Sequence, residues 1–378
     1  MTMPLDHADQ PALVVHHLTK RFRGAPALDD VGFTVPRASL TVILGHAGAG
    51  KTTTLRIVAG LTQPDFGQVL LSGRDVAGRQ PKDRDVAMIF DNLALYPDKT
   101  GFENIASPLR VRGRPRAEIE EKVTAMAGVL RIGHTLKRLP ATMSGGERQR
   151  IALGRALIRS PRLFLLDEPL SSLDAQLRIE LRAELRRLQS EHGYSFLMAT
   201  PDFNEALAIA DTVVMLRQGR VVQIAPPQEL YDHPVDRETA LSVGAPLINL
   251  VDARFDPDAS RLLAGGWRLD APEHLARSLA GGPGAFELGI RPENLVLSDP
   301  GRATILGELA DIEPLGLNSV LTVKNGQAQV RLVVASSQAR GLSLGEPIGL
   351  EIANPSMVRA FDLETGHSLT RQVSSRDA

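Results

Sequence analysis

The stretch Gly45 to Thr53, GHAGAGKTT, carries the clearest chemistry in the sequence. It fits the phosphate-loop pattern G-x-x-x-x-G-K-[ST], in which glycines let backbone N–H groups point into one concavity. Lys51 would reach the outer phosphates of a nucleotide, and the Thr52 hydroxyl would bind Mg²⁺. The residues predicted to bind the nucleotide here are Gly45, His46, Ala47, Gly48, Ala49, Gly50, Lys51, Thr52 and Thr53.

The residues on both sides of this loop fit the same interpretation. The apolar run 40–44 predicts a strand before the loop, and the segment 55–59 predicts a helix after it. The N-terminus of that helix would add partial positive charge facing the phosphates. A glycine-rich turn without a ligand is the alternative, but it leaves the Lys-Thr pair unexplained. The sequence therefore predicts that the chain binds a nucleoside triphosphate.

A pair of acidic residues follows a second apolar run, at 162–166. Asp167, at the carboxyl end of the predicted strand, would hold Mg²⁺, and Glu168 would polarise the attacking water as general base. A helix N-cap is the alternative interpretation of the pair. Together with Lys51 and Thr52, these acids predict hydrolysis of the nucleotide.

A helix start at Ser144 forms the third candidate. Ser144 and Glu147 have the S-x-x-E spacing of a capping box, and Gly145 and Gly146 between them allow close approach of a ligand. This helix end would bind an anion, but it has no lysine of its own. We therefore expect it to complete a phosphate site built mainly elsewhere, the alternative being a well-capped helix without a ligand.

Composition limits the functional class. The 378 residues contain 43 Lys and Arg against 44 Asp and Glu, so a formal net charge of -1 gives no basic excess for nucleic acid. Cysteine is absent, which excludes disulfides and thiolate metal sites. We find neither a signal peptide in the first residues nor an apolar run of about 18 residues. Any membrane role would therefore come through a partner.

The chain is long enough for two domains. Strands alternate with helices up to about residue 216, which predicts a mostly parallel α/β sheet. Two short early strands, 13–15 and 31–35, would be joined through a polar connection that contains Phe22. After a proline-rich segment, short alternating strands predict a small β-barrel or sandwich. We expect one domain at 1–235, with helices at about 98–160, and a second at 236–378.

At this point the motifs resemble those of ABC ATPases. The order of phosphate loop, helical insert, Ser144–Arg150 signature and Asp-Glu-Pro matches that family along residues 13–235. The stretches 103–105 and 289–293 resemble the carbohydrate-importer subfamily typified by the maltose ATPase. Members of that subfamily carry a C-terminal β domain of the oligonucleotide/oligosaccharide-binding (OB-like) type. Segments 105–108 and 245–249 look similar to the same stretches in the ATPases of glycerol or related polyol importers. Some of these importers use two different ATPases.

The resemblance implies ATP and Mg²⁺ as cofactors and several partners. A second ABC ATPase subunit, a paralogue or another copy, would meet this one head to tail, each signature closing over the other's nucleotide. Phe22 would stack on the adenine ring, and Asp174 would lie at the subunit boundary. The region near 95–97 would receive a helix of a transmembrane permease. The chain would work at the cytoplasmic face of the cell membrane, with an extracytoplasmic solute-binding protein as an indirect partner.

Two positions depart from the family pattern. Asp91 stands where a glutamine normally contacts Mg²⁺ and the water; it could still bind Mg²⁺ but adds negative charge. Pro201 stands where a histidine normally contacts the γ-phosphate, and it restricts Thr200 to an extended backbone. Glu147 in place of the usual signature glutamine is a milder change. Losing two contacts would slow hydrolysis roughly 10³-fold or more, so we expect a slow site in an asymmetric pair.

Other functions remain open from the sequence. A regulatory subunit that binds nucleotide without hydrolysing it is the main alternative. A soluble ABC ATPase of translation or repair would normally show two cassettes or a sustained coiled-coil heptad, which we do not find. A small-molecule kinase would leave the capped helix at Ser144 and the β-rich tail unexplained. The transported solute would be selected by the pore and the extracytoplasmic binding protein, which are other chains.

Overall fold

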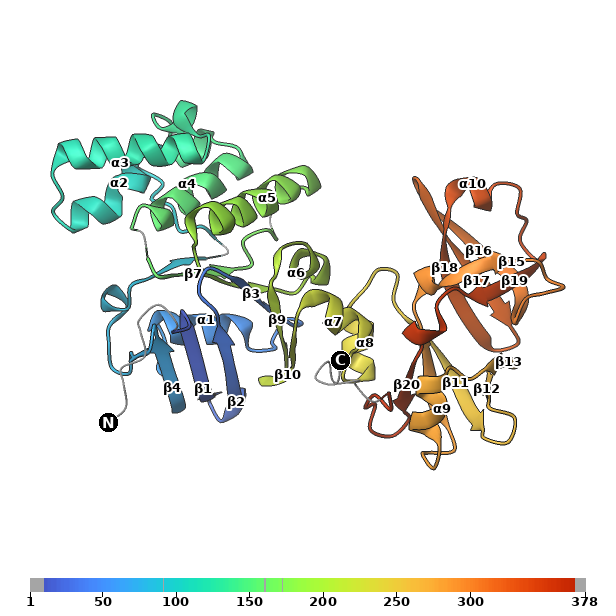
Figure 1. Ribbon diagram of the computed structural model, residues 1–378. Helices are drawn as coiled ribbons and strands as arrows, with labels where there is room; N and C mark the ends of the chain where they lie inside the picture. The colour runs from blue at the N-terminus through green and yellow to red at the C-terminus, as the bar shows by residue number, and fades with distance from the viewer. Residues whose placement is uncertain (1–9, 91, 160, 172, 371–378) are drawn as a thin grey trace. The chain divides into compact units, whose positions relative to one another are not determined.

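The computed structural model describes residues 10–90, 92–159, 161–171 and 173–370. These residues form two compact units that divide between Gln228 and Glu229. Figure 1 shows both units with their helices and strands labelled. In the described part of the chain, no helix is both long and apolar enough to cross a bilayer.

The first unit is built on a six-stranded sheet with the order β10-β9-β3-β8-β7-β6. Neighbouring strands are parallel except that β10 runs antiparallel to β9, which confirms the predicted mostly parallel sheet. Every residue of the neighbouring strands β3, β8 and β7 is buried, as expected for a sheet covered on both faces. The strands are β3 (Leu40–Leu44), β6 (Val86–Ile89), β7 (Leu163–Asp167), β8 (Phe196–Thr200), β9 (Thr212–Arg217) and β10 (Arg220–Ala225).

The first strands form a separate antiparallel sheet, and here one expectation was wrong. Phe22 does not lie in a polar connection; it ends β1 and pairs with Ala25 at the start of β2. The turn is only Arg23 and Gly24, both with positive φ (48° and 85°), as a tight hairpin requires. Sheet order is β2-β1-β4-β5, with β1 (Leu13–Phe22), β2 (Ala25–Val35), β4 (Phe66–Leu71) and β5 (Arg74–Asp75).

Helices complete the first unit. Helix α2 packs against both α3 and α4 (Figure 1), and these three form the helical segment of this unit. Helix α1 packs under the strands of the main sheet. The helices are α1 (Lys51–Ala59), η1 (Pro81–Asp83), α2 (Gly101–Val111), α3 (Arg116–Val129), η2 (Gly133–Thr135), η3 (Pro140–Thr142), α4 (Gly145–Leu157), α5 (Ala175–His192) and α6 (Phe203–Ile209), with α7 (Pro227–Asp232) at the division between units.

The second unit contains two five-stranded antiparallel sheets, β13-β12-β11-β14-β20 and β15-β19-β16-β17-β18. One continuous apolar core joins their buried side chains, which confirms the predicted all-β tail. Its elements are α8 (Arg237–Ser242), β11 (Asn249–Asp256), β12 (Arg261–Ala264), β13 (Trp267–Asp270), α9 (Glu273–Leu279), β14 (Phe286–Ile290), η4 (Pro292–Asn294), β15 (Leu295–Ser298), β16 (Ile305–Leu315), β17 (Asn318–Asn325), β18 (Ala328–Ala335), α10 (Ser336–Ala339), β19 (Pro347–Ile352), η5 (Pro355–Met357) and β20 (Arg359–Asp362).

Arg291 bonds three backbone carbonyls at the start of the second unit. Its guanidinium donates to the backbone carbonyls of Tyr231, Ala240 and Val243 at 2.9, 3.1 and 2.6 Å, and lies 3.9 Å from the centre of the Tyr231 ring. Burial lowers the pKa of Arg291 to about 10. Three carbonyls therefore depend on one buried cation.

Arg291→Ala is expected to lower the free energy of unfolding of this unit by about 3 kcal/mol, because three carbonyls lose their donor, two of them in buried hydrogen bonds. Trp267, the single tryptophan, is buried in this unit, so its fluorescence during urea unfolding reports the change. Arg340→Ala, at an exposed position, is the matched control. Equal midpoints for both variants would contradict the prediction.

Candidate nucleotide site and signature helix

The glycine-rich loop lies between the end of β3 and the start of α1, as the sequence predicts. Gly50 caps α1 with φ 106°, a left-handed conformation that favours glycine. Gly45 has no room for a side chain, because a Cβ there would lie 2.2 Å from the carbonyl oxygen of Leu216 on β9. The loop thus packs against β9 and leads into the N-terminus of α1, where an anion is favoured.

Lys51 is buried at the first position of α1 and folds back over the loop. Its Nζ donates to the carbonyls of Gly45 at 2.8 Å and His46 at 3.1 Å. The same Nζ lies 3.7 Å from Glu168 Oε1. The cation and the predicted general base therefore share one site.

Thr52 and Asp167 meet although they are far apart in sequence. The Thr52 hydroxyl donates to Asp167 Oδ1 at 3.1 Å. Asp167 ends β7, and both side chains lie at the carboxyl edge of the parallel sheet. A hydroxyl beside a carboxylate next to a phosphate loop is a donor set that suits Mg²⁺, which is bound by few protein oxygens and by phosphate. These residues fit the metal predicted from the sequence.

Glu168 has a backbone conformation that is unusual for its residue type. Its φ is 46°, in the left-handed region. Its N–H donates to the carbonyl of Ala199 on β8 at 3.0 Å, and its carbonyl accepts from the N–H and the hydroxyl of Ser171. These bonds hold a strained residue in place, a feature that often accompanies functional sites.

Pro201 lies at the same edge of the sheet. Thr200 ends β8 and pairs with Leu44, the last residue before the loop, while Ala199 pairs with Asp167. The extended conformation predicted for Thr200 is confirmed. Its hydroxyl donates to the buried Glu205 at 2.5 Å, and burial raises the pKa of that carboxyl. The other altered position, Asp91, lies outside the described residues.

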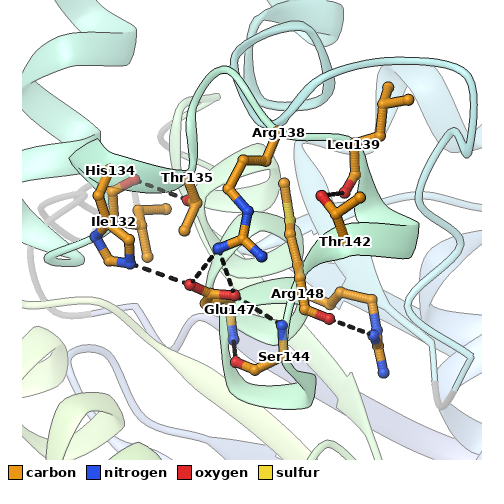
Figure 2. A network of polar contacts seen from close by, with 10 residues as sticks. Ile132, His134, Thr135, Arg138, Leu139, Thr142, Ser144, Glu147 and Arg148 are labelled. Atoms are coloured by element: carbon orange, nitrogen blue, oxygen red, sulfur yellow. Dashed lines mark hydrogen bonds and ion pairs between the residues drawn. The ribbon is translucent and has the colours of Figure 1, made fainter.

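The capping box of the signature is confirmed. Ser144 is the N-cap of α4: its hydroxyl accepts from the N–H of Glu147 at 3.2 Å, and its own N–H donates to Glu147 Oε2 at 2.7 Å. Figure 2 shows Glu147 also facing Arg138 and His134. The pKa of Glu147 is lowered most by the hydrogen bond from the Ser144 N–H. His134 and Arg138 lower it further. Gly146 packs closely against Leu177 of α5.

The local contacts of Phe22 and Asp174 link these residues less directly to the predicted nucleotide site. The Phe22 side chain is 49% exposed, and the Lys20 ammonium lies 5.5 Å from its ring centre. Asp174 is the N-cap of α5, accepting from the N–H of Leu177 at 2.9 Å. No hydrogen bond or ion pair joins either residue to Lys51 or Thr52 within the described ranges.

Two residues with structural roles in this unit were missed from the sequence as individual candidates. Asn104 is fully buried and binds the 96–100 loop, with Oδ1 accepting from the N–H of Tyr96 and Nδ2 donating to three carbonyls. Arg155 of α4 donates to the carbonyls of Leu93 and Ala94 at 2.9 and 2.7 Å. The signature helix is thus bonded to the segment just after position 91, a connection that no sequence motif indicates.

A groove of about 560 Å³ opens beside this segment, between α2, α4 and β6. Its apolar part includes Val111, which is 88% exposed. Its charged part is mainly basic, with Lys82, Arg112, Arg155 and Arg159 against Asp83. We call this the α2–α4 groove. Its shape and charge suit a short helix that carries apolar and acidic side chains.

Comparison with known proteins gives consistent findings over both units. Residues 28–171 match the family described as ABC transporter, and residues 288–359 match the family described as TOBE domain. The sn-glycerol-3-phosphate import ATP-binding protein of Chromobacterium violaceum is 37% identical over 368 residues, 96% of this chain and 98% of its own length. The protein of the same name from Cereibacter sphaeroides is 37% identical over 353 residues, 93% of this chain and 97% of its own length.

A solved structure also resembles the chain. The cbiO1 protein of Clostridium perfringens, described as part of the ABC transporter complex cbiONQ, superposes with a TM-score of 0.56 at 25% sequence identity. The match covers 60% of this chain and 92% of the other.

Proposed function

This chain belongs to the family of ABC transporter ATP-binding proteins, and from that premise we propose that it couples ATP binding and hydrolysis to import of a solute. The observation that carries this function is the meeting of Lys51, Thr52, Asp167 and Glu168 at one edge of the sheet. Lys51 would neutralise the outer phosphates, and Thr52 with Asp167 would hold Mg²⁺, which supplies further positive charge there. Glu168 would take the proton of the attacking water.

The nucleotide would be shared between two ATPase subunits. The exposed Ser144 at the N-cap of α4, with Gly145, Gly146 and Glu147, would close over the nucleotide of a second subunit, a paralogue or another copy. Phe22 would stack on adenine, which its exposure permits. Asp174 would lie near the boundary between subunits. In this proposal residues 1–235 form the nucleotide-binding domain and residues 236–378 a regulatory β domain.

The membrane partners follow from the α2–α4 groove. We propose that a helix of a permease subunit docks there, which would place this chain peripherally at the cytoplasmic face of the membrane. Arg155 would transmit the contact, since it bonds the segment after position 91 from within the signature helix. The relatives are named for import of sn-glycerol 3-phosphate, and we propose a polyol or polyol phosphate as solute. An extracytoplasmic solute-binding protein would deliver it.

ATP hydrolysis by this chain, alone and co-purified with its partner subunits, tests the proposed function. We expect Mg²⁺-dependent turnover that is slow for the chain alone and rises in the complex. Lys51→Ala should abolish the turnover of the chain alone, because the buried cation at the phosphate loop is lost. Turnover of the chain alone that is unaffected by Lys51→Ala would contradict the proposal.

Val111→Glu is expected to weaken binding to the permease at least tenfold, because it puts a carboxylate into the apolar part of the α2–α4 groove. Co-purification with the membrane subunits measures the effect. Leu61→Glu, at a 48% exposed position outside the groove, is the matched control. ATP binding by both variants should stay at the wild-type level. Equal recovery of the permease with both variants would rule out docking at this groove.

A further inference from the structure

Glu147 places a negative charge where the signature helix would face a phosphate. It is the third residue of α4, within the first turn, where the free N–H groups and the helix dipole favour an anion. A fixed carboxylate in the same turn would repel that anion. For this helix end to accept a phosphate, the charge of Glu147 has to be countered.

Two side chains from the segment before the helix contact the Glu147 carboxylate (Figure 2). Arg138 Nη1 donates to Oε1 at 3.0 Å and to Oε2 at 3.3 Å, and His134 Nε2 lies 3.1 Å from Oε1. The Glu147 side chain is only 19% exposed, which limits screening of this ion pair by solvent. Because Arg138 is always charged, its guanidinium offsets the negative charge of Glu147 at all times.

The position of Arg138 is fixed by the helical segment. Its N–H donates to the carbonyl of Thr135, and its carbonyl accepts from the N–H of Gly101 at the start of α2, both at 2.9 Å. The next N–H of α2, from Phe102, donates to the carbonyl of Leu136 at 2.8 Å. Arg138 is therefore held by the helix that borders the α2–α4 groove while its guanidinium reaches the signature.

We propose that Arg138 is a positioning residue that neutralises Glu147, so that the signature helix of this chain can accept the phosphate of a nucleotide bound to a second ATPase subunit. This inference rests on the proposed function. Arg138 acts through Glu147 and does not itself contact the phosphate. A signature with glutamine at position 147 would have no charge to cancel, so the importance of Arg138 depends on the residue at that position.

The test is ATP-driven association of ATPase subunits, measured by sedimentation with Mg²⁺ and ATP. The full-length chain carries Glu168→Gln to suppress hydrolysis and is paired with the ATPase subunit that co-purifies with it, or with itself when none does. Arg138→Ala should weaken association about tenfold. In the Glu147→Gln background, the same change should have less than a twofold effect, because glutamine keeps the capping box without the charge. Arg138→Lys should retain most of the association.

Lys137→Ala is the matched control, since it removes an exposed positive charge from the same segment and leaves Glu147 untouched. It should associate as the parent does. An equal loss from Arg138→Ala in both backgrounds would overturn the inference and assign Arg138 a merely structural role. Absence of ATP-driven association in every variant, Glu147→Gln included, would overturn the proposed shared nucleotide site, and the inference with it.

Discussion

Asp91→Gln combined with Pro201→His is expected to raise ATP turnover at this chain's own nucleotide site by about 10³-fold, since each change would restore one of the contacts to the nucleotide or its water that the family resemblance implies. The structure supports the choice of Pro201, because β8 ends between the strand of the phosphate loop and the strand of Asp167. A side chain at 201 therefore starts at the sheet edge where the proposed catalytic groups lie. Proline has no group there that can donate a hydrogen bond.

The measurement is the rate of ATP hydrolysis of the chain alone and of its complex, for wild type and the double variant. Pro201→Ala is the control, because it releases the backbone restriction without adding a donor. We expect alanine to leave turnover near the wild-type rate. If wild type already turns over quickly as a homodimer, and the double change adds little, Asp91 and Pro201 are tolerated substitutions and the asymmetric pair is wrong.

The local chemistry of the site could be predicted because it depends on short spacing. Lys51 and Thr52 follow a strand and open a helix, and Ser144 with Glu147 forms a capping box, as both patterns require. Asp167 was placed at the end of an apolar run, and the parallel sheet brings it to Thr52. In such a sheet all carboxyl ends meet at one edge, so the pairing of distant residues follows from the fold.

The first strands were predicted poorly because their pattern is mixed. Lys20 and Arg21 lie within β1 but are polar, so the apolar alternation that marks a strand is lost before Phe22. Both residues bind Asp65: the Lys20 ammonium donates to its carboxylate at 2.8 Å, and the backbone N–H of Arg21 donates to the same carboxylate. These contacts span 45 and 44 residues of sequence, and no local pattern contains them.

The contacts of Arg138 and Arg155 could not be predicted for a similar reason. Each binds a group outside its own helix or turn, one a carboxylate nine residues away and the other two carbonyls more than 60 residues away. In the sequence both are ordinary arginines of a helical, charged segment. Their roles depend on how α2 and α4 pack, which is a property of the tertiary structure.

Glu168→Gln is expected to lower turnover of the Asp91→Gln/Pro201→His variant by about 10³-fold, the usual contribution of a general base. Glutamine has nearly the same shape, so the Glu168 backbone bonds to Ala199 and Ser171 remain, and ATP binding should change less than twofold. Quenched-flow hydrolysis and ATP binding measured on the same preparation separate the two effects. Glu121→Gln, at an exposed position on α3, controls for loss of a charge.

This experiment uses the Asp91→Gln/Pro201→His variant and not the wild-type chain. In the wild-type complex a faster second ATPase subunit would mask the loss at this site, whereas in the restored variant this chain contributes turnover of its own. A large fall in turnover with Glu168→Gln would show that Glu168 takes the proton of the attacking water, and it would identify the chain as an ATPase slowed by Asp91 and Pro201. No restored turnover and no effect of Glu168→Gln, with ATP still bound, would instead identify a regulatory subunit that binds ATP without hydrolysing it. The two outcomes differ because Lys51 and Thr52 would serve ATP binding in both cases, while Glu168 would serve only hydrolysis.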